Sequence, residues 1–256
     1  YPMPVSRKRI SIGFPSLKQS IKACIELVKV GITPETVYLF EYINCGQYLE
    51  RAGVEVPGEF AAAILFGFSG DEDLVDFFIE RTEKVCAKFG GVKLDQRFAE
   101  AWWDSIFVTK ETLDRNPFPT SHRKVEPDLI DACVPIGRVK EYYEEYVKLR
   151  KKYGWDKWPF GFTAVASPRG PIPFLIYLCI PIDTSDEKEI EKWFKFKEEM
   201  YMIALRLGGT LSDGNGIGLR TNKWVRDELG PAFDVLKNIK KLLDPKNILN
   251  RGIRGF

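Results

Sequence analysis

The sequence alternates short apolar runs with longer amphipathic segments, and this alternation limits the chain to folds that pack helices on a sheet. A strand-like run followed by a helical stripe occurs four times along the 256 residues. The strand-like runs are residues 9–14, 61–68, 129–135 and 174–182. Apolar residues follow each run at helical spacing, and glycines or prolines interrupt the pattern. The chain therefore predicts a mixed sheet-and-helix protein.

Local signals mark where some of the helices begin and end. Ser16 begins an S-x-x-Q capping box before the first helix, and Thr184 begins a T-x-x-E box before the fourth. Later in the chain, Gly230-Pro231 divides the C-terminal tail into two predicted helices.

Three further strand candidates lie between these units, at residues 36–42, 92–95 and 162–167. The strands are short and the helices fall between them, so hairpin-like pairing is favoured over a doubly wound parallel sheet. We therefore predict an α+β fold in which two ferredoxin-like halves form one antiparallel sheet, flanked by helices that lie largely on one face.

Histidine and cysteine usage excludes several kinds of active site. His122 is the single histidine, so a zinc or iron site with several histidine ligands cannot be built. A serine hydrolase triad would need that histidine, and no G-x-S-x-G motif is present. The five cysteines are widely spaced and form no C-x-x-C pair, which favours reduced, buried thiols over a metal site or disulfides.

Charge and hydropathy exclude two classes of partner. Lys and Arg total 38 against 36 Asp and Glu, and this near balance argues against a dedicated nucleic-acid binder. No apolar run reaches the roughly 18 residues that a membrane-spanning helix needs. No charged-then-apolar leader follows Tyr1, and together with the reduced thiols this predicts a cytoplasmic protein.

The densest glycine cluster, residues 208–218, is a candidate functional loop. Its G-x-G-x-G spacing is not a dinucleotide fingerprint, because a predicted helix rather than a strand precedes it. No P-loop motif occurs in the chain. Two interpretations remain: the glycines form turns that need positive φ angles, or the loop presents polar groups, chiefly Asp213 and Asn215, at a site.

Two arginines and the C-terminal tail are further candidates. Arg169 lies in a predicted turn and Arg138 at a predicted helix entrance, where a guanidinium either clamps a carboxylate or phosphate or stays solvated. Residues 220–256 contain nine Lys and Arg against four acidic residues. This tail is either a solvated basic face or a surface that docks against an acidic partner.

Several of these segments together resemble a known family. Its closing signature is matched by Gly208-Gly209-Thr210, Gly216-Ile217-Gly218, Glu228-Leu229-Gly230 and the stretch from Leu243-Asp244-Pro245 to Gly252. Ile12-Gly13-Phe14-Pro15-Ser16 before an amphipathic helix is similar to the start of the family's C-terminal domain. The chain resembles FAD-linked oxidases of the glycolate oxidase and D-lactate dehydrogenase type, in the vanillyl-alcohol-oxidase superfamily.

The resemblance implies that residues 1–209 form a cap or substrate domain. Residues 210–256 would then hold the glycine-rich loop and the C-terminal helices that pack on an FAD-binding domain or subunit outside this chain. The implied function is the substrate-binding portion of an FAD-dependent oxidoreductase, which oxidises a 2-hydroxy acid such as D-lactate or glycolate, or a related alcohol, by hydride transfer to flavin. FAD would be bound mainly by the other domain, so the chain alone would be inactive. The sequence leaves open whether the protein forms a homodimer.

The resemblance also implies roles for individual residues. Gly216, Asn247 and Asn250 would lie near the cofactor. Arg169 or Arg138 would hold a substrate carboxylate, as the two-pronged guanidinium allows.

The sequence departs from the family at two motifs. The H-x-G-D-G-N-x-H segment of metal-using members corresponds to residues 166–174, which contain no histidine, so no metal is expected. The family's Glu-His-Gly motif corresponds to Gly214-Asn215-Gly216, which puts Asn215 at the position of the catalytic base. An Asn amide does not accept a proton at neutral pH, so Asp213 is a candidate base if burial raises its pKa. A tyrosine or a residue of the other domain is the alternative.

Two alternative functions remain open. Gly209-Thr210-Leu211-Ser212 also resembles the G-G-[ST]-L-S stretch of alkylglycerone-phosphate synthases, although the histidine run that follows it there is absent here. The missing histidines also fit a non-catalytic subunit that docks on a separate flavoprotein.

Overall fold

The computed structural model describes residues 3–41, 53, 60–105, 125–155, 162–166, 173–183, 185–212, 216–219 and 221–253. Seven strands within these ranges form one sheet in the order β4-β1-β3-β2-β6-β7-β5. Every recorded pair of neighbouring strands is antiparallel. The predicted α+β class and the single antiparallel sheet are therefore confirmed.

The first half of the sheet comes from the chain up to residue 105. It runs β1 (Ser6–Phe14), α1 (Leu17–Lys29), β2 (Thr36–Glu41), β3 (Ala62–Gly70), α3 (Glu72–Ala87), β4 (Val92–Lys93) and α4 (Gln96–Ser105). The capping box at Ser16 is confirmed, since the Ser16 side-chain oxygen accepts a hydrogen bond from the backbone N–H of Gln19 at 3.3 Å.

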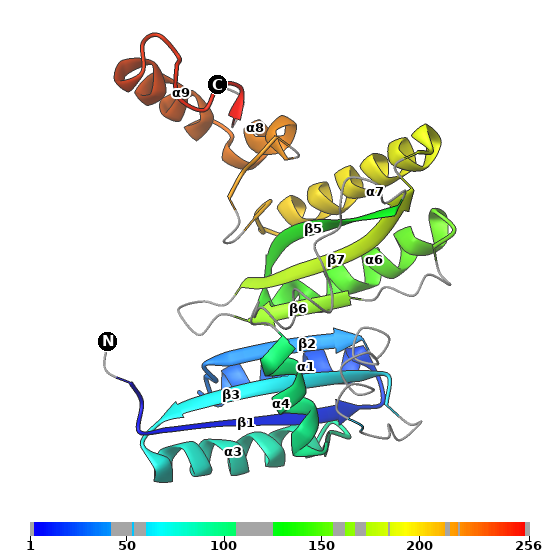
Figure 1. Ribbon diagram of the computed structural model, residues 1–256, viewed down its shortest axis with the longest axis vertical. Coiled ribbons are helices and arrows are strands. Elements are labelled where there is room, and N and C mark those ends of the chain that lie inside the picture. Colours follow the sequence, from blue (N-terminus) through cyan, green and yellow to red (C-terminus); the bar gives the residue numbers. More distant parts are fainter. Residues whose placement is uncertain are drawn as a thin grey trace.

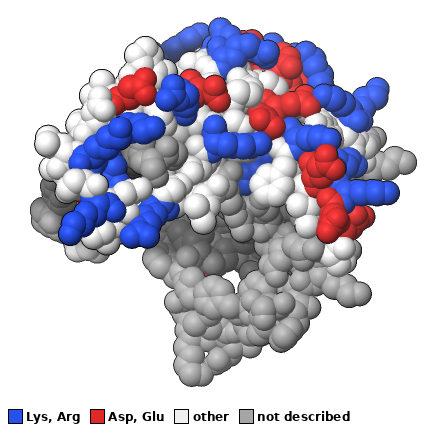
Figure 2. Space-filling view, turned by 90° about the horizontal axis from the view of Figure 1, so that it is seen from above, with Lys and Arg blue, Asp and Glu red and all other residues white. Residues whose placement is uncertain are grey.

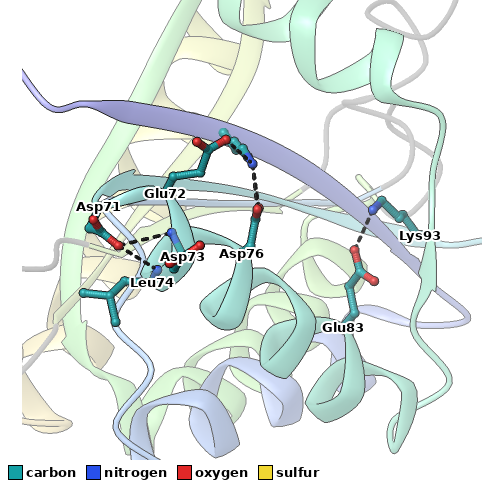
Figure 3. A network of polar contacts seen from close by, with 8 residues as sticks. Asp71, Glu72, Asp73, Leu74, Asp76, Glu83 and Lys93 are labelled. Carbon is teal, nitrogen blue, oxygen red and sulfur yellow. Dashed lines mark hydrogen bonds and ion pairs between the residues drawn. The ribbon is translucent and has the colours of Figure 1, made fainter.

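Helix α3 shows how polar contacts fix elements of this half (Figure 3). Asp71 caps the helix, because its carboxylate accepts hydrogen bonds from the backbone N–H groups of Asp73 at 3.2 Å and Leu74 at 3.4 Å. Nearer the other end, Glu83 pairs with Lys93 of β4 at 2.7 Å. Exposed ion pairs such as Glu83–Lys93 contribute little to stability. The Asp71 cap therefore fixes where α3 begins, and the Glu83–Lys93 pair helps to fix its position, without accounting for the burial of the helix.

The second half follows a similar plan. It runs β5 (Val125–Pro135), the 3-10 turn η1 (Ile136–Arg138), α6 (Val139–Lys152), β6 (Phe162–Ala166), β7 (Pro173–Asp183) and α7 (Glu187–Arg206). β2 of the first half pairs with β6 of the second, which joins the halves into one sheet. Asp186 caps α7 by accepting a hydrogen bond from Lys188 N at 2.9 Å. The predicted cap, Thr184, lies outside the described residues, and Asp186 holds the cap position in its place.

Four helices share one face of the sheet, and α4 covers part of the other (Figure 1). α1, α3, α6 and α7 contribute to a core in which Phe14 of the first half is continuous with Tyr146 and Phe196 of the second. On the opposite face, Trp102 of α4 packs against Phe40 of β2 with ring centroids 5.9 Å apart. The prediction that helices lie largely on one face holds for these four, and α4 is the exception.

Cys24, Cys86 and Cys133 are buried. Cys24 and Cys86 carry free thiols, which confirms the prediction for these two residues. Burial raises the pKa of the Cys86 thiol to about 12, so it stays protonated. The side chains of Cys45 and Cys179 lie outside the described part of the chain.

After α7 the chain leaves the sheet and forms two more helices, α8 (Val225–Leu229) and α9 (Ala232–Leu243), with the predicted break at Gly230-Pro231 between them. Trp224, in the short helix η2 (Asn222–Trp224), attaches the start of this helical segment to α7. Its ring packs on Tyr201 of α7 at 4.9 Å between centroids, and its Nε1 donates to Glu198 Oε1 at 3.1 Å. Beyond this anchor α8 and α9 project from the sheet (Figure 1). We call residues 225–253 the C-terminal arm.

The C-terminal arm buries little of its own apolar surface. Phe233 is buried, whereas Val235, Ile239, Leu242 and Leu243 are exposed. The spacing of Val235, Ile239 and Leu242 places them along one side of α9. Despite this apolar stripe, no helix in the described ranges is long and apolar enough to cross a membrane.

Candidate functional site

The start of the glycine-rich segment, residues 208–218, lies against β5. Thr210 N donates to Cys133 O at 2.8 Å, and Cys133 N donates to Thr210 O at 3.0 Å. A Cβ placed on Gly209 would lie 2.0 Å from the Cys133 carbonyl oxygen, far inside van der Waals contact. Only glycine allows this approach, so the close contact with β5 accounts for Gly209.

Asp131 of β5 is the buried carboxylate beside this segment. Its neighbours Ile130 and Ala132 belong to the core under the four helices, so strand alternation puts Asp131 on the opposite face. It is 6% exposed, and its Oδ2 accepts a hydrogen bond from Ser212 Oγ at 2.8 Å. The backbone N–H of Asp131 donates to the Tyr201 hydroxyl oxygen at 3.5 Å.

Sequence reasoning missed Asp131, although a signal was present. An aspartate inside the apolar run 129–135 is unusual, because strand carboxylates are rarely buried without a hydrogen-bond donor. The donor, Ser212, is 81 residues away in the sequence, so the pair could not be recognised from local pattern.

A second contact ties the glycine-rich segment to the C-terminal arm. The Thr210 hydroxyl donates to the Glu228 carboxylate of α8, and it also lies 3.3 Å from the Ser212 carbonyl oxygen. Leu211, between these two residues, is fully buried. The segment therefore lies at the junction of β5, α7 and α8.

The structure describes only some of the predicted site residues. Asp213, Asn215 and Arg169 lie outside the described residues. Arg138 is exposed at the start of α6, and its guanidinium pairs with Glu141 at 2.8 Å.

Gly216 is exposed and has a φ of +74°, which fits the interpretation of the glycines as turn residues at this position. Among the described residues, no heavy atom lies within 4 Å of where its Cβ would be. The backbone here is accessible, so another molecule could approach it closely.

Asn247 and Asn250 share the loop that follows α9. Both are exposed non-glycine residues with positive φ angles, 47° and 45°. Such conformations persist where surrounding contacts hold them, and side chains of this type tolerate them best. No contact recorded among the described residues joins this loop to Arg138 or Gly216.

Asp244 organises that loop. Its carboxylate accepts hydrogen bonds from the backbone N–H groups of Ile248 and Leu249, each at 2.9 Å, and pairs with the Lys240 ammonium. The Lys240 hydrogen bond, followed by the backbone N–H groups, lowers the pKa of Asp244 to about 2. The loop thereby holds Ile248 and Leu249 in exposed positions.

Charge on this end of the molecule is mostly positive. Figure 2 looks onto the end that carries the C-terminal arm, and Lys and Arg side chains spread over it with acidic groups between them. In the described ranges, no group of three or more His, Cys, Asp and Glu side chains is arranged to hold a metal ion.

Comparison with known proteins gives one family. The family described as FAD linked oxidases, C-terminal domain, matches residues 3–253. A D-lactate dehydrogenase of Archaeoglobus fulgidus is 22% identical over 248 residues, which cover 95% of this chain and 50% of the relative. The glycolate oxidase subunit GlcD of Bacillus subtilis is 21% identical over 252 residues, which cover 98% of this chain and 51% of the relative. The chain spans about half the length of the curated relatives it matches.

Solved structures share the fold. An alkyldihydroxyacetonephosphate synthase superposes with a TM-score of 0.58 at 15% identity, over 97% of this chain and 44% of that chain. A p-cresol methylhydroxylase with bound substrate superposes with a TM-score of 0.68 at 15% identity, over 100% of this chain and 54% of that chain. At such identities the likeness establishes the fold alone.

Proposed function

Because the chain belongs to the family of C-terminal domains of FAD-linked oxidases, we propose that it is the substrate-binding portion of an FAD-dependent oxidoreductase. The proposed reaction oxidises a 2-hydroxy acid similar to D-lactate or glycolate, or a related alcohol. The names of two relatives, a D-lactate dehydrogenase and a glycolate oxidase subunit, support this substrate class. FAD, when bound, supplies the hydride acceptor.

The proposed architecture has two ferredoxin-like halves. The order β4-β1-β3-β2 with helices after its first and third strands along the chain supports this for the first half. In the second half the strand order is β6-β7-β5. Thr210 forms an antiparallel bridge to the outer edge of β5, where a fourth strand would lie.

The single observation that carries the proposed domain division is the exposed apolar stripe of α9. Val235, Ile239 and Leu242 line a helix that packs on little of this chain, and a stripe of this kind normally faces another surface. About half of each relative lies beyond the matched region, which leaves room for a second domain. Residues 1–209 would bind substrate, and residues 210–256 would pack on the FAD-binding domain.

The described residues fit the edge of a flavin site rather than its main binding pocket. Open backbone at Gly216 and exposed amides at Asn247 and Asn250 can face a cofactor, but they enclose no cradle of their own. This agrees with FAD being held mainly by the other domain. The basic charge of the arm would favour an acidic partner surface.

Proton handling is assigned to the glycine-rich segment. Asp213 is the proposed acceptor of the substrate hydroxyl proton, and Asn215 would orient the substrate through its amide. Arg169 is the proposed carboxylate clamp. Arg138 is the weaker candidate for that role, because it is exposed and already pairs with Glu141.

The experiment uses the flavoprotein that contains this chain, purified with its flavin. Under anaerobic conditions it is mixed with D-lactate, glycolate, L-lactate and a glycerone-phosphate ester in turn. The proposal predicts that a 2-hydroxy acid bleaches the visible absorbance of oxidised flavin. A colourless protein would support a non-catalytic subunit, and a coloured protein that none of the three hydroxy acids reduces would contradict the proposed 2-hydroxy acid substrate.

A further inference from the structure

We propose that Asp131 and Ser212 form a positioning pair, which fixes residues 210–212 of the glycine-rich segment on β5, directly before the proposed base Asp213 in the sequence. The inference rests on the proposed function for its catalytic consequence. The anchor itself is a property of this chain and can be measured without turnover.

The burial of Asp131 is the first argument. A carboxylate that is 6% exposed has lost most of its water, and that loss must be replaced by donors from the protein. Ser212 Oγ supplies one donor at 2.8 Å. A hydrogen bond to a charged, buried acceptor is stronger and more strictly oriented than one between neutral groups in water, so it fixes Ser212 closely.

Ser212 is the last of three consecutive attached residues in the glycine-rich segment. Three consecutive residues have separate attachments: Thr210 pairs with the β5 backbone, Leu211 is buried in the core, and Ser212 bonds Asp131. Ser212 is the last of these, and Asp213 follows it directly in the sequence. Without the bond to Asp131, Leu211 would be the last attached residue of residues 210–212.

The surroundings of Asp131 are the third argument. β5 is the last strand of the described sheet, so its outer edge needs hydrogen-bond partners. Thr210 supplies them at Cys133, and the Tyr201 hydroxyl accepts from Asp131 N at 3.5 Å. The same aspartate is thus held by α7 through its backbone and holds the glycine-rich segment through its side chain.

The test compares three variants of the flavoprotein. Ser212→Ala removes the donor, and Ser212→Thr keeps a hydroxyl at the same place. Thr82→Ala is the matched control, because Thr82 is a buried hydroxyl of α3 with no hydrogen-bond partner among the described residues.

Amide hydrogen exchange at Thr210 and Ser212 reports the anchor. Ser212→Ala should speed exchange there by about tenfold, the loss expected for one hydrogen bond, while Ser212→Thr and the control leave it within about twofold. Anaerobic flavin reduction reports the catalytic consequence. Ser212→Ala should lower the kcat by about tenfold to 100-fold with little change in KM, and Ser212→Thr should restore it.

Unchanged exchange in Ser212→Ala would overturn the proposal, as would faster exchange with an unchanged kcat, because the pair would then be merely structural. If Ser212→Ala does not yield folded protein, Asp131→Asn replaces it in the test. This variant keeps an acceptor oxygen but removes the charge, so its amide exchange and kcat should lie between those of the unaltered protein and those predicted for Ser212→Ala. If no hydroxy acid reduces the unaltered flavoprotein, the proposed function fails separately, and the exchange rates alone decide whether the anchor exists.

Discussion

Helices α7 and α9 are both amphipathic, but they differ in what covers their apolar sides. α7 buries Trp193, Phe196 and Met200 under the sheet, whereas α9 buries Phe233 and leaves residues such as Leu242 exposed. A helix that buries its stripe gains its stability from this chain, and one that does not needs another surface. The comparison divides the molecule into a sheet whose helices bury their apolar sides within this chain and an arm whose apolar side this chain leaves exposed.

Gly209, whose backbone lies against Cys133 of β5, is the position where substitution should destabilise the protein most. Gly209→Ala should destabilise the protein by more than about 4 kcal/mol, because the added carbon overlaps the Cys133 carbonyl oxygen and neither backbone can move freely. Gly218→Ala is the control, since no atom of the described part of the chain lies within 4 Å of its added carbon. Chemical denaturation checks both, and similar losses in the two variants would refute the close approach.

Two side-chain truncations test the difference in burial between α7 and α9. Met200→Ala in α7 removes a fully buried side chain and should cost about 3 kcal/mol. Leu242→Ala in α9 removes a side chain that is 81% exposed and should change the unfolding free energy of this chain by less than about 0.5 kcal/mol. Equal costs, measured by urea denaturation, would mean that the arm is packed on this chain after all.

A smaller effect tests how the two halves of the sheet are joined. Tyr143 of α6 donates a hydrogen bond to Glu41 at the end of β2 at 2.8 Å. Tyr143→Phe should lose about 1–2 kcal/mol, because a charged acceptor is left with one donor fewer. Tyr142→Phe is the control: the Tyr142 hydroxyl is buried with no hydrogen-bond partner among the described residues, so its removal should not destabilise. Thermal unfolding that ranks the two variants in the opposite order would rule out this join.

The smallest effect concerns the loop of the arm and its response to pH. The folded-state pKa of Asp244 is lowered to about 2, so the hydrogen bonds to Ile248 and Leu249 are fully present above about pH 4 and are lost as pH falls toward 2. Exchange of those two amides should accelerate across this window relative to the intrinsic rate. In Asp244→Asn the pH response should disappear; if it persists, another group controls the loop.

Short sequence motifs predicted those structural features whose physical cause lies in neighbouring residues. The capping box at Ser16 and the break at Gly230-Pro231 each depend on neighbouring residues, and both appear where predicted. The short apolar runs likewise predicted strands of the sheet, although the candidate at residues 92–95 forms only the two-residue strand β4, which pairs with β1 at two positions.

Other features of the candidate site depend on contacts between residues that lie far apart in the chain. Gly209 needs its missing side chain because of Cys133, and Asp131 is satisfied by Ser212. Neither contact can be recognised from neighbouring residues, because the two partners lie far apart in the sequence. The apolar spacing of α9 alone did not predict its exposure, because α7 buries a stripe of the same kind. The family resemblance did imply that this helix packs on another domain.

We propose that the apolar stripe of the C-terminal arm packs on an FAD-binding domain. Side-chain labelling by hydroxyl radicals tests it directly, in the intact flavoprotein and in the isolated chain of residues 1–256. We predict that Val235, Ile239 and Leu242 react readily in the isolated chain and become strongly protected in the flavoprotein. Equal labelling of these residues in both samples would contradict the account.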